Sequence, residues 1–308
     1  PATIGKIKSK DYEFPNIIYF DTERFKAPDY SDILIKKNID YISKKKEIDV
    51  VKYSRQMFQK PKKFVDEIIK IKMDNKIIYT PAIADASNIS LLTYLGINFF
   101  DSLNAIISAR DKNMFFTSGT INVRDIFENP CNCQICINLN KKPKDKSFKE
   151  ILNHNYLKIF YELKNIKNHI RLNKLRSLVE KRVISSPHLT SILRYLDQNY
   201  YDYLEEKTPI SSQKKIFTTT IESLKRPEII RFQKRLINSY SKPKSAKILL
   251  LLPCSAKKPY SFSKSHSFFK RTIKESINPH IIHEVVVTSP LGIVPRELEL
   301  IYPVSNYD

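Results

Sequence analysis

Three of the four cysteines of the chain lie close together, in a C-x-C-x-x-C pattern at Cys131, Cys133 and Cys136. Their spacing is too tight for disulfides, and an intracellular compartment is reducing. Three thiolates from one turn and an imidazole from a helix can complete a tetrahedron around zinc. His154 is the predicted fourth ligand, with His169 as the alternative. Because all four ligands come from the protein, we predict a structural rather than a catalytic zinc site.

The net charge points to a polyanionic partner. The chain has 53 Lys and Arg residues against 32 Asp and Glu, a formal net charge of +21. A protein this basic fits a phosphate backbone, although a lysine-rich genome would give the same composition. The four glycines are dispersed, whereas phosphate-cradling loops need several close together. We therefore expect neither a P-loop nor a dinucleotide fingerprint, and no methyl-donor loop.

The remaining composition is that of a globular protein, with 42% hydrophobic residues. No apolar run approaches the roughly 18 residues that span a membrane. No charged segment followed by an apolar core is visible at the N-terminus. We expect a soluble, cytoplasmic protein with no membrane partner.

The first 125 residues have the pattern of a mixed α/β fold. Strands are predicted at 12–20, 76–80 and 97–100, and a helix at 86–95 precedes the last of these. The order strand, helix, strand favours a parallel βαβ unit. From 148 to 240 apolar residues recur at helical spacing, and helices are predicted to begin near 148, 187 and 227.

The C-terminal segment predicts a second parallel βαβ unit. The short apolar run at 247–252 is typical of a buried strand, and a second strand is predicted at 281–288. Ser263 can cap the helix between them, which should run to about Ile277. Two parallel strands joined in this way have a right-handed crossover.

Cys254 follows the first of these strands and stands apart from the other cysteines. His266 is expected in the first turn of the next helix, and Ser289 follows the second strand, so all three should meet at the edge where α/β sheets bind ligands. The helix N-terminus, Lys257 and Lys258 would favour a thiolate. The alternative is a buried cysteine that acts as a small apolar residue.

These segments resemble a known family. The cysteine cluster with His154-Asn155 is similar to the zinc site of tRNA-guanine transglycosylases. The segment 253–266, which follows the pattern P-C-S-x-x-K-P-Y-x-x-S-x-x-H, resembles the archaeosine synthase alpha subunits, as do 223–228, 289–299, 302–303 and 307–308. The resemblance covers most of residues 75–308.

The resemblance implies an α/β fold in two domains. Residues 1–185 would form a reduced TIM-barrel-like, transglycosylase-type half-barrel with the zinc site, followed by a helical middle part. Residues 186–308 would form the archaeosine synthase core, an α/β domain with the parallel βαβ unit. No stretch matches the catalytic aspartates of the transglycosylases. The first domain would therefore have a structural or tRNA-docking role.

The implied activity is a transfer of free lysine to the nitrile of 7-cyano-7-deazaguanine in the D-arm of tRNA. Cys254 would attack the nitrile, and His266 would move protons. Lys258 and Tyr260 would hold the thiolate or polarise the nitrile, and Ser263 would orient His266. The predicted substrate-binding residues are Ser255, Ser289, Arg296 for the lysine carboxylate, and Glu297 or Asp308 for its amino group. The alternatives are an ordinary surface pair for Arg296 and Glu297, and packing for Tyr260.

Partners and rival functions follow from the same resemblance. A radical-SAM enzyme completes archaeosine in this family, and members usually continue into an RNA-binding PUA module. We expect the basic surface or a separate RNA-binding subunit to supply tRNA affinity here. The rival functions are a transglycosylase that exchanges the base itself and a non-catalytic, zinc-containing tRNA-binding subunit.

Overall fold

The computed structural model describes residues 5–6, 13–35, 48–138 and 142–308. The chain divides into two compact units, Pro1–Leu196 and Asp197–Asp308, which we call unit 1 and unit 2. The domain boundary after residue 185 stays a prediction. Among the described residues, no helix has both the length and the apolar character needed to cross a bilayer.

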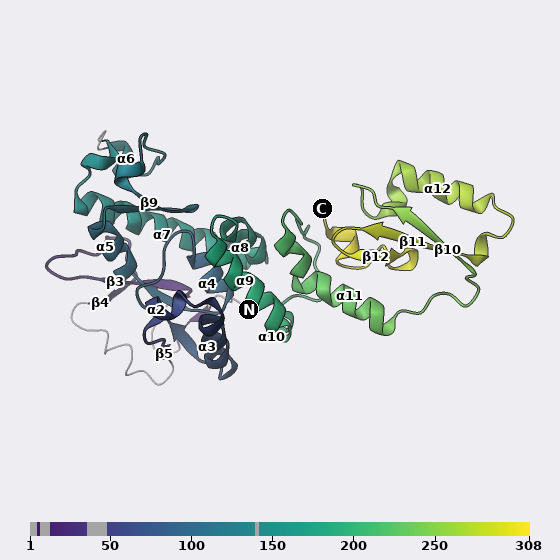
Figure 1. Ribbon diagram of the computed structural model, residues 1–308, viewed down its shortest axis with the longest axis horizontal. Coiled ribbons are helices and arrows are strands. Elements are labelled where there is room, and N and C mark those ends of the chain that lie inside the picture. Colours follow the sequence, from purple (N-terminus) through teal and green to yellow (C-terminus); the bar gives the residue numbers. More distant parts are fainter. Residues whose placement is uncertain (1–4, 7–12, 36–47, 139–141) are drawn as a thin grey trace. The chain divides into compact units, whose positions relative to one another are not determined.

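A five-stranded parallel sheet forms the centre of unit 1 (Figure 1). Its strand order is β4-β3-β7-β6-β5, and each neighbouring pair is parallel. The strands are β3 (Asn16–Phe20), β4 (Ile33–Ile35), β5 (Ile48–Val50), β6 (Ile77–Tyr79) and β7 (Phe99–Asp101). The short β1 (Gly5–Lys6) and β2 (Glu13–Phe14) pair separately.

Helices connect these strands. They are α2 (Ser54–Phe58), α3 (Pro61–Met73), α4 (Ile89–Tyr94) and α5 (Leu103–Arg110). The predicted parallel βαβ unit is confirmed, because α4 joins the parallel strands β6 and β7. The α/β class is thus as predicted, whereas a reduced barrel stays a prediction. Tyr12, where the first predicted strand begins, lies outside the described residues.

A β-hairpin and a run of helices complete unit 1. The hairpin, which the sequence analysis did not predict, consists of β8 (Asn113–Phe116) and β9 (Gly119–Asn122). The short α6 (Gln134–Asn138) is followed by α7 (Phe148–Arg171), which begins with a capping box between Ser147 and Glu150. Then come α8 (Leu175–Val183) and α9 (Pro187–Asn199), which crosses the unit boundary.

Unit 2 contains the predicted parallel pair. It consists of α10 (Tyr201–Glu206), α11 (Pro227–Ser239), β10 (Ile248–Pro253), α12 (Lys264–Lys274), β11 (Ile282–Thr288) and β12 (Gly292–Pro295). The strand order is β10-β11-β12. β10 and β11 are parallel and β12 is antiparallel to β11. Ser263 caps α12, as predicted, and the helix ends at Lys274 rather than near Ile277.

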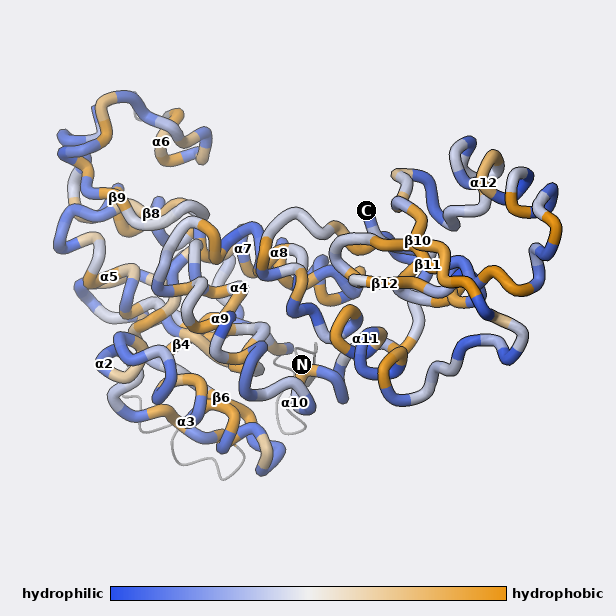
Figure 2. The backbone as a smooth tube through the Cα atoms, turned by 45° about the vertical axis from the view of Figure 1, so that its right-hand side comes forward, coloured by the Kyte–Doolittle hydropathy of each residue, from blue (hydrophilic) through white to orange (hydrophobic). Residues whose placement is uncertain are grey.

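The prediction of a buried strand at 247–252 is wrong. β10 is apolar throughout (Figure 2), but Leu249 and Leu251 are 61% and 57% exposed. Leu252 alone in this strand is buried, and Leu250 packs against the same core. The reason is position, because β10 lies at the edge of the sheet and its side chains alternate between the core face and the outer face.

Candidate functional site

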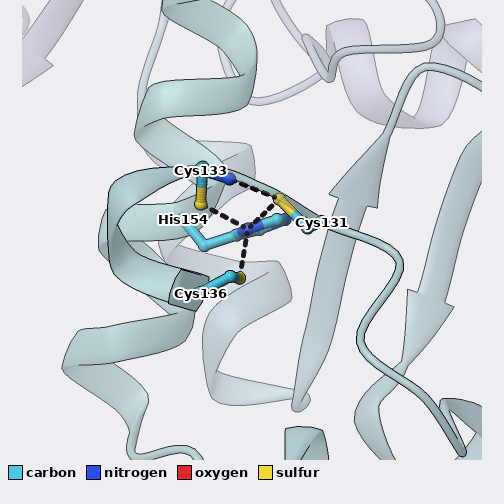
Figure 3. Close-up of side chains that lie close together, drawn as sticks. All are labelled: Cys131, Cys133, Cys136 and His154. Atoms are coloured by element: carbon cyan, nitrogen blue, oxygen red, sulfur yellow. Dashed lines mark hydrogen bonds between the residues drawn. The ribbon is translucent and has the colours of Figure 1, made fainter. Parts of the chain in front are cut away.

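The three clustered cysteines converge on His154, as predicted. The Nδ1 atom of His154 lies 3.7, 3.5 and 3.4 Å from the sulfurs of Cys131, Cys133 and Cys136 (Figure 3). All four donor atoms lie within 4.8 Å of one another. A tetrahedral site with ordinary zinc–sulfur and zinc–nitrogen bonds has a sulfur–nitrogen separation of about 3.6 Å. The group could therefore hold a metal ion.

Neighbouring hydrogen bonds fix the orientation of the imidazole. Nε2 of His154 donates to the carbonyl of Phe115 at 2.9 Å, which leaves Nδ1 to face the sulfurs. The next residue, Asn155, accepts from the Phe115 amide and donates to the Asn113 carbonyl. α7 is thereby tied to β8 beside the cluster. His169, the alternative ligand, instead hydrogen-bonds through Nδ1 to the carbonyl of Asn165.

The second candidate site lies at the carboxyl edge of the β10–β11 pair. Cys254 directly follows β10 and its side chain is exposed. Pro253 pairs with Val287, so Ser289 follows β11 at the same edge. The predicted position of Cys254 at this edge is confirmed, and the alternative of a buried cysteine is wrong.

A hydrogen-bond network holds the backbone before Cys254. Nε2 of the buried His266 donates to the carbonyl of Pro253 at 2.9 Å. Its Nδ1 accepts from Nη2 of Arg296, also at 2.9 Å. Arg296 in turn donates to Glu284 at 2.9 and 2.7 Å and to Glu299 at 3.1 Å. We call these residues the Arg296 network.

The network occupies both ring nitrogens of His266. Burial, followed by the charge of Arg296, lowers the pKa of its imidazole. The ring is therefore neutral near pH 7, with its proton on Nε2. This arrangement favours a positioning role over the predicted proton transfer, because neither nitrogen is open to a substrate.

The hydrogen-bond donors of Arg296 are likewise occupied by protein groups. Each of its three guanidinium nitrogens donates to a protein acceptor. Glu299 extends the network, because it accepts from the backbone and the hydroxyl of Ser261 in the loop before α12. Binding of the lysine carboxylate by Arg296 stays a prediction that these contacts do not favour.

Next to the thiol lies a chain of hydroxyls and a cation. The hydroxyl of Tyr307 hydrogen-bonds to those of Tyr260 and Thr288. The ammonium of Lys258 lies 4.0 Å from the centre of the Tyr307 ring. Burial lowers the pKa of Lys258, while nearby Asp308 and Cys254 act in the opposite direction. Lys258 is therefore close enough to Cys254 to interact with a charge on its sulfur.

Three further predicted residues contact other groups of unit 2. Tyr260 is fully buried and stacks on His266, which favours the packing alternative. Ser255 donates to the carbonyl of Lys257. Glu297 accepts from Tyr240 and lies 3.8 Å from His283, so it is turned towards other partners.

Asp308 lies near Lys258, the cation beside the thiol. Its carboxylate lies 3.5 Å from Nζ of Lys215, and its charge partly offsets the burial that lowers the pKa of Lys258. It can therefore tune the charge beside Cys254. Ser289 lies at the correct edge, and its carbonyl accepts from Thr288.

Sequence reasoning missed one buried carboxylate. Asp101 ends β7, and burial raises its pKa to about 6. It accepts from the Tyr79 hydroxyl at 2.6 Å and from the amides of Ala82 and Leu103 at 3.0 Å. Catalytic carboxylates often lie at the carboxyl ends of parallel strands. The place of Asp101 directly after a predicted strand could therefore have marked it as a candidate site residue.

We expect the Arg296 network to make unit 2 sensitive to acid. The folded pKa of His266 lies below the unfolded value of about 6.5. The unfolded chain therefore binds the proton more readily, and stability is lost as the pH falls below about 6.5. Thermal melting at pH 7.5 and 5.5 should show a larger fall in Tm for the wild type than for His266→Gln. Equal falls would contradict the prediction.

Both units contain segments that match known protein families. Residues 51–188 match the family model described as queuine tRNA-ribosyltransferase, and 229–308 match a domain of unknown function, DUF5591. The archaeosine synthase subunit alpha of Methanosarcina acetivorans is 37% identical over 80% of this chain and 40% of its own length. That of Thermoplasma acidophilum is 36% identical over 84% of this chain and 46% of its own.

A transglycosylase is also similar. The tRNA-guanine(15) transglycosylase of Methanobrevibacter smithii is 32% identical over 70% of this chain and 33% of its own length. The chain thus spans less than half the length of these curated relatives. Over about four fifths of its length, the chain is a homologue of the archaeosine synthase alpha subunits.

Proposed function

We propose that the chain acts in archaeosine biosynthesis by joining free lysine to the nitrile of 7-cyano-7-deazaguanine in tRNA. The observation that carries this proposal is the exposed thiol of Cys254 at the carboxyl edge of β10, on a backbone held by the Arg296 network. An anchored and accessible sulfur suits a nucleophile. The homology to archaeosine synthases supplies the substrate class.

In the first step the thiolate of Cys254 adds to the nitrile carbon. A carbon–sulfur bond forms, and one carbon–nitrogen π bond breaks as its electron pair moves to nitrogen. That nitrogen takes a proton, which gives a covalent thioimidate. Lys258 is the proton donor in this proposal, because it lies beside the thiol and its lowered pKa makes its ammonium a better acid.

In the second step an amine of lysine attacks the same carbon. A carbon–nitrogen bond forms, the carbon–sulfur bond breaks and the thiolate leaves with its electron pair. The amine loses a proton, which returns Lys258 to its ammonium form, and an amidine remains on the base. His266 positions the Cys254 backbone throughout and does not transfer protons.

The cysteine cluster of unit 1 holds zinc in this proposal. Three thiolates and an imidazole are a donor set that zinc prefers in closed structural sites. Zinc there would fix the segment 131–136 against α7 and supply no chemistry to the reaction. The net charge of +21 supports docking of the tRNA phosphate backbone, and other subunits, such as a radical-SAM enzyme or a PUA module, would complete the pathway.

Mass spectrometry of the tRNA tests the proposal. The full chain is incubated with lysine and with tRNA that carries 7-cyano-7-deazaguanine. We expect the tRNA to gain the mass of one lysine, and tRNA with guanine at that position to gain none. Folded, zinc-loaded protein that gives no mass gain would contradict the proposal.

Base exchange is the second candidate, and one observation favours it. Asp101 lies at the carboxyl end of β7 in the segment that matches the queuine tRNA-ribosyltransferase model. A transglycosylase would use such a carboxylate as its nucleophile. However, Asp101 is fully buried and holds three donors from its own unit. Incorporation of labelled guanine into tRNA, lost in Asp101→Asn, would establish base exchange.

A further inference from the structure

The first turn of α12 lies beside the residue that precedes the reactive thiol. Nε2 of His266 donates to the carbonyl of Pro253, directly before Cys254, at 2.9 Å. Phe269 and Ile273 follow His266 at spacings of three and four residues, and all three side chains are buried or half-buried. They form the inner face of the helix, and Phe269 packs against the core of unit 2. The opposite face of α12 therefore begins close to Cys254.

That opposite face carries cations on both sides of an aromatic ring. Lys264, Phe268 and Arg271 are exposed and follow one another at spacings of four and three residues, so they share one face of the helix. The structure describes every residue of α12, and Phe268 is the single apolar side chain at its exposed positions. This ring is 56% exposed. It gains little from packing within its own chain.

A second exposed ring lies beside the helix. Phe262 is 63% exposed and directly precedes the N-cap residue Ser263. The hydroxyl of Ser267 donates to the carbonyl of Ser261 at 3.3 Å, which holds the segment with Phe262 against the turn that carries Phe268. We call Phe262, Lys264, Phe268 and Arg271 the α12 face.

No nearby acidic residue balances the cations of this face. The sequence has no Asp or Glu between Glu228 and Glu275. Neither Lys264 nor Arg271 forms an ion pair with any residue in the described part of the chain. Lys264 also stands in the first turn of α12, where the helix dipole disfavours a cation and no acidic residue offsets it. A cation at this position costs stability, which indicates an anionic partner.

Exposed rings among unpaired cations are typical of surfaces that bind unpaired RNA. The cations bind phosphates, and the bases stack on the rings. A membrane is the other extended anionic surface, but a helix that lies on a membrane needs a broad apolar face. In α12 that apolar face is turned towards its own unit. The α12 face therefore favours RNA.

We propose that the α12 face binds the unpaired tRNA strand on either side of the base that reacts with Cys254. Lys264 and Arg271 bind phosphates of this strand, and Phe262 and Phe268 stack on neighbouring bases. An enzyme that modifies a base takes that base out of its stack, so the bases beside it need new stacking partners. The inference rests on the proposed function for the identity of the RNA, and it adds the surface that holds the strand.

Binding of tRNA over a series of salt concentrations tests the inference. Fluorescence anisotropy is measured with the full chain and tRNA that carries 7-cyano-7-deazaguanine, without lysine. The double variant Lys264→Gln/Arg271→Gln should bind more weakly, and the slope of log affinity against log salt should become shallower by roughly 1.5, since each phosphate contact contributes about 0.7–0.9. Phe268→Leu should weaken binding roughly tenfold with an unchanged slope, because it removes stacking and no charge. Phe268→Tyr keeps a flat ring and should bind as the wild type does.

A matched double variant controls for the total charge. Arg235→Gln/Lys244→Gln removes one arginine and one lysine from exposed positions elsewhere in unit 2. It should leave the affinity and the slope close to those of the wild type. Because all the substituted side chains are exposed, every variant should keep the wild-type Tm. An equal loss of affinity in this control and in Lys264→Gln/Arg271→Gln would contradict the inference.

The remaining outcomes separate this inference from the proposed function. If the variants of the α12 face bind tRNA as the wild type does, the strand binds elsewhere, even if the tRNA still gains lysine. If they lose binding as expected but the wild type adds no lysine, the surface stands and the transfer reaction does not. Cosedimentation with vesicles of phosphatidylglycerol and phosphatidylcholine tests the membrane. Vesicle binding that these variants lose, with tRNA binding unchanged, would overturn the inference.

Discussion

Replacing Cys254 by serine is expected to reduce lysine transfer to tRNA by about 10³-fold or more. A serine hydroxyl is a far weaker nucleophile than a thiolate at neutral pH, and the covalent intermediate would not form. The measurement is the rate of mass gain of cyano-deazaguanine tRNA. Trapping gives a second readout, since without lysine the wild-type protein should gain the mass of the whole tRNA as a covalent adduct and Cys254→Ser should not.

Controls exclude an indirect effect of this substitution. Cys254 is exposed and its side chain is not part of the unit 2 core, so Cys254→Ser should keep the wild-type Tm. Ser276→Ala, a change to an exposed hydroxyl just after α12, should keep full activity. If Cys254→Ser transfers lysine at the wild-type rate, the sulfur is not the nucleophile, and a scaffold function becomes the better explanation.

Local sequence patterns were sufficient to predict those structural features that a single segment of the chain determines. The tight C-x-C-x-x-C spacing keeps the three sulfurs close together, and all of them lie within 3.7 Å of Nδ1 of His154. The order of β10, α12 and β11 likewise determines a parallel pair, because a helical crossover returns the chain to the same edge. These features required no knowledge of the rest of the chain.

Features that depend on contacts between distant parts of the chain could not be predicted from the sequence. Arg296 follows a strand edge and looks available for a carboxylate, but Glu284 on β11 lies 2.7 Å from its guanidinium. No pattern in the sequence pairs these two residues. The exposure of Leu249 has the same origin, because an apolar run does not reveal whether its strand lies inside the sheet or at its edge. The burial of Asp101 and its hydrogen bonds to Tyr79 and Ala82 also depend on the tertiary structure.

Replacing His154 by alanine is expected to remove zinc and to destabilise unit 1. Structural zinc sites contribute several kcal/mol to folding, and each kcal/mol corresponds to about 2–4 °C in a domain of this size. We therefore expect the Tm of unit 1 to fall by about 10 °C or more. The substitution also removes the hydrogen bond to the Phe115 carbonyl. Metal analysis gives the zinc content and circular dichroism gives the Tm.

His169→Ala is the matched control for this substitution. The two histidines lie on the same helix, α7, but only His154 faces the sulfurs. His169→Ala should therefore keep one zinc per chain and nearly the wild-type Tm. A chelator should lower the Tm of the wild type and of His169→Ala, but not lower that of His154→Ala any further, because that variant has no metal left to lose. Full zinc content in His154→Ala would show that another residue completes the site.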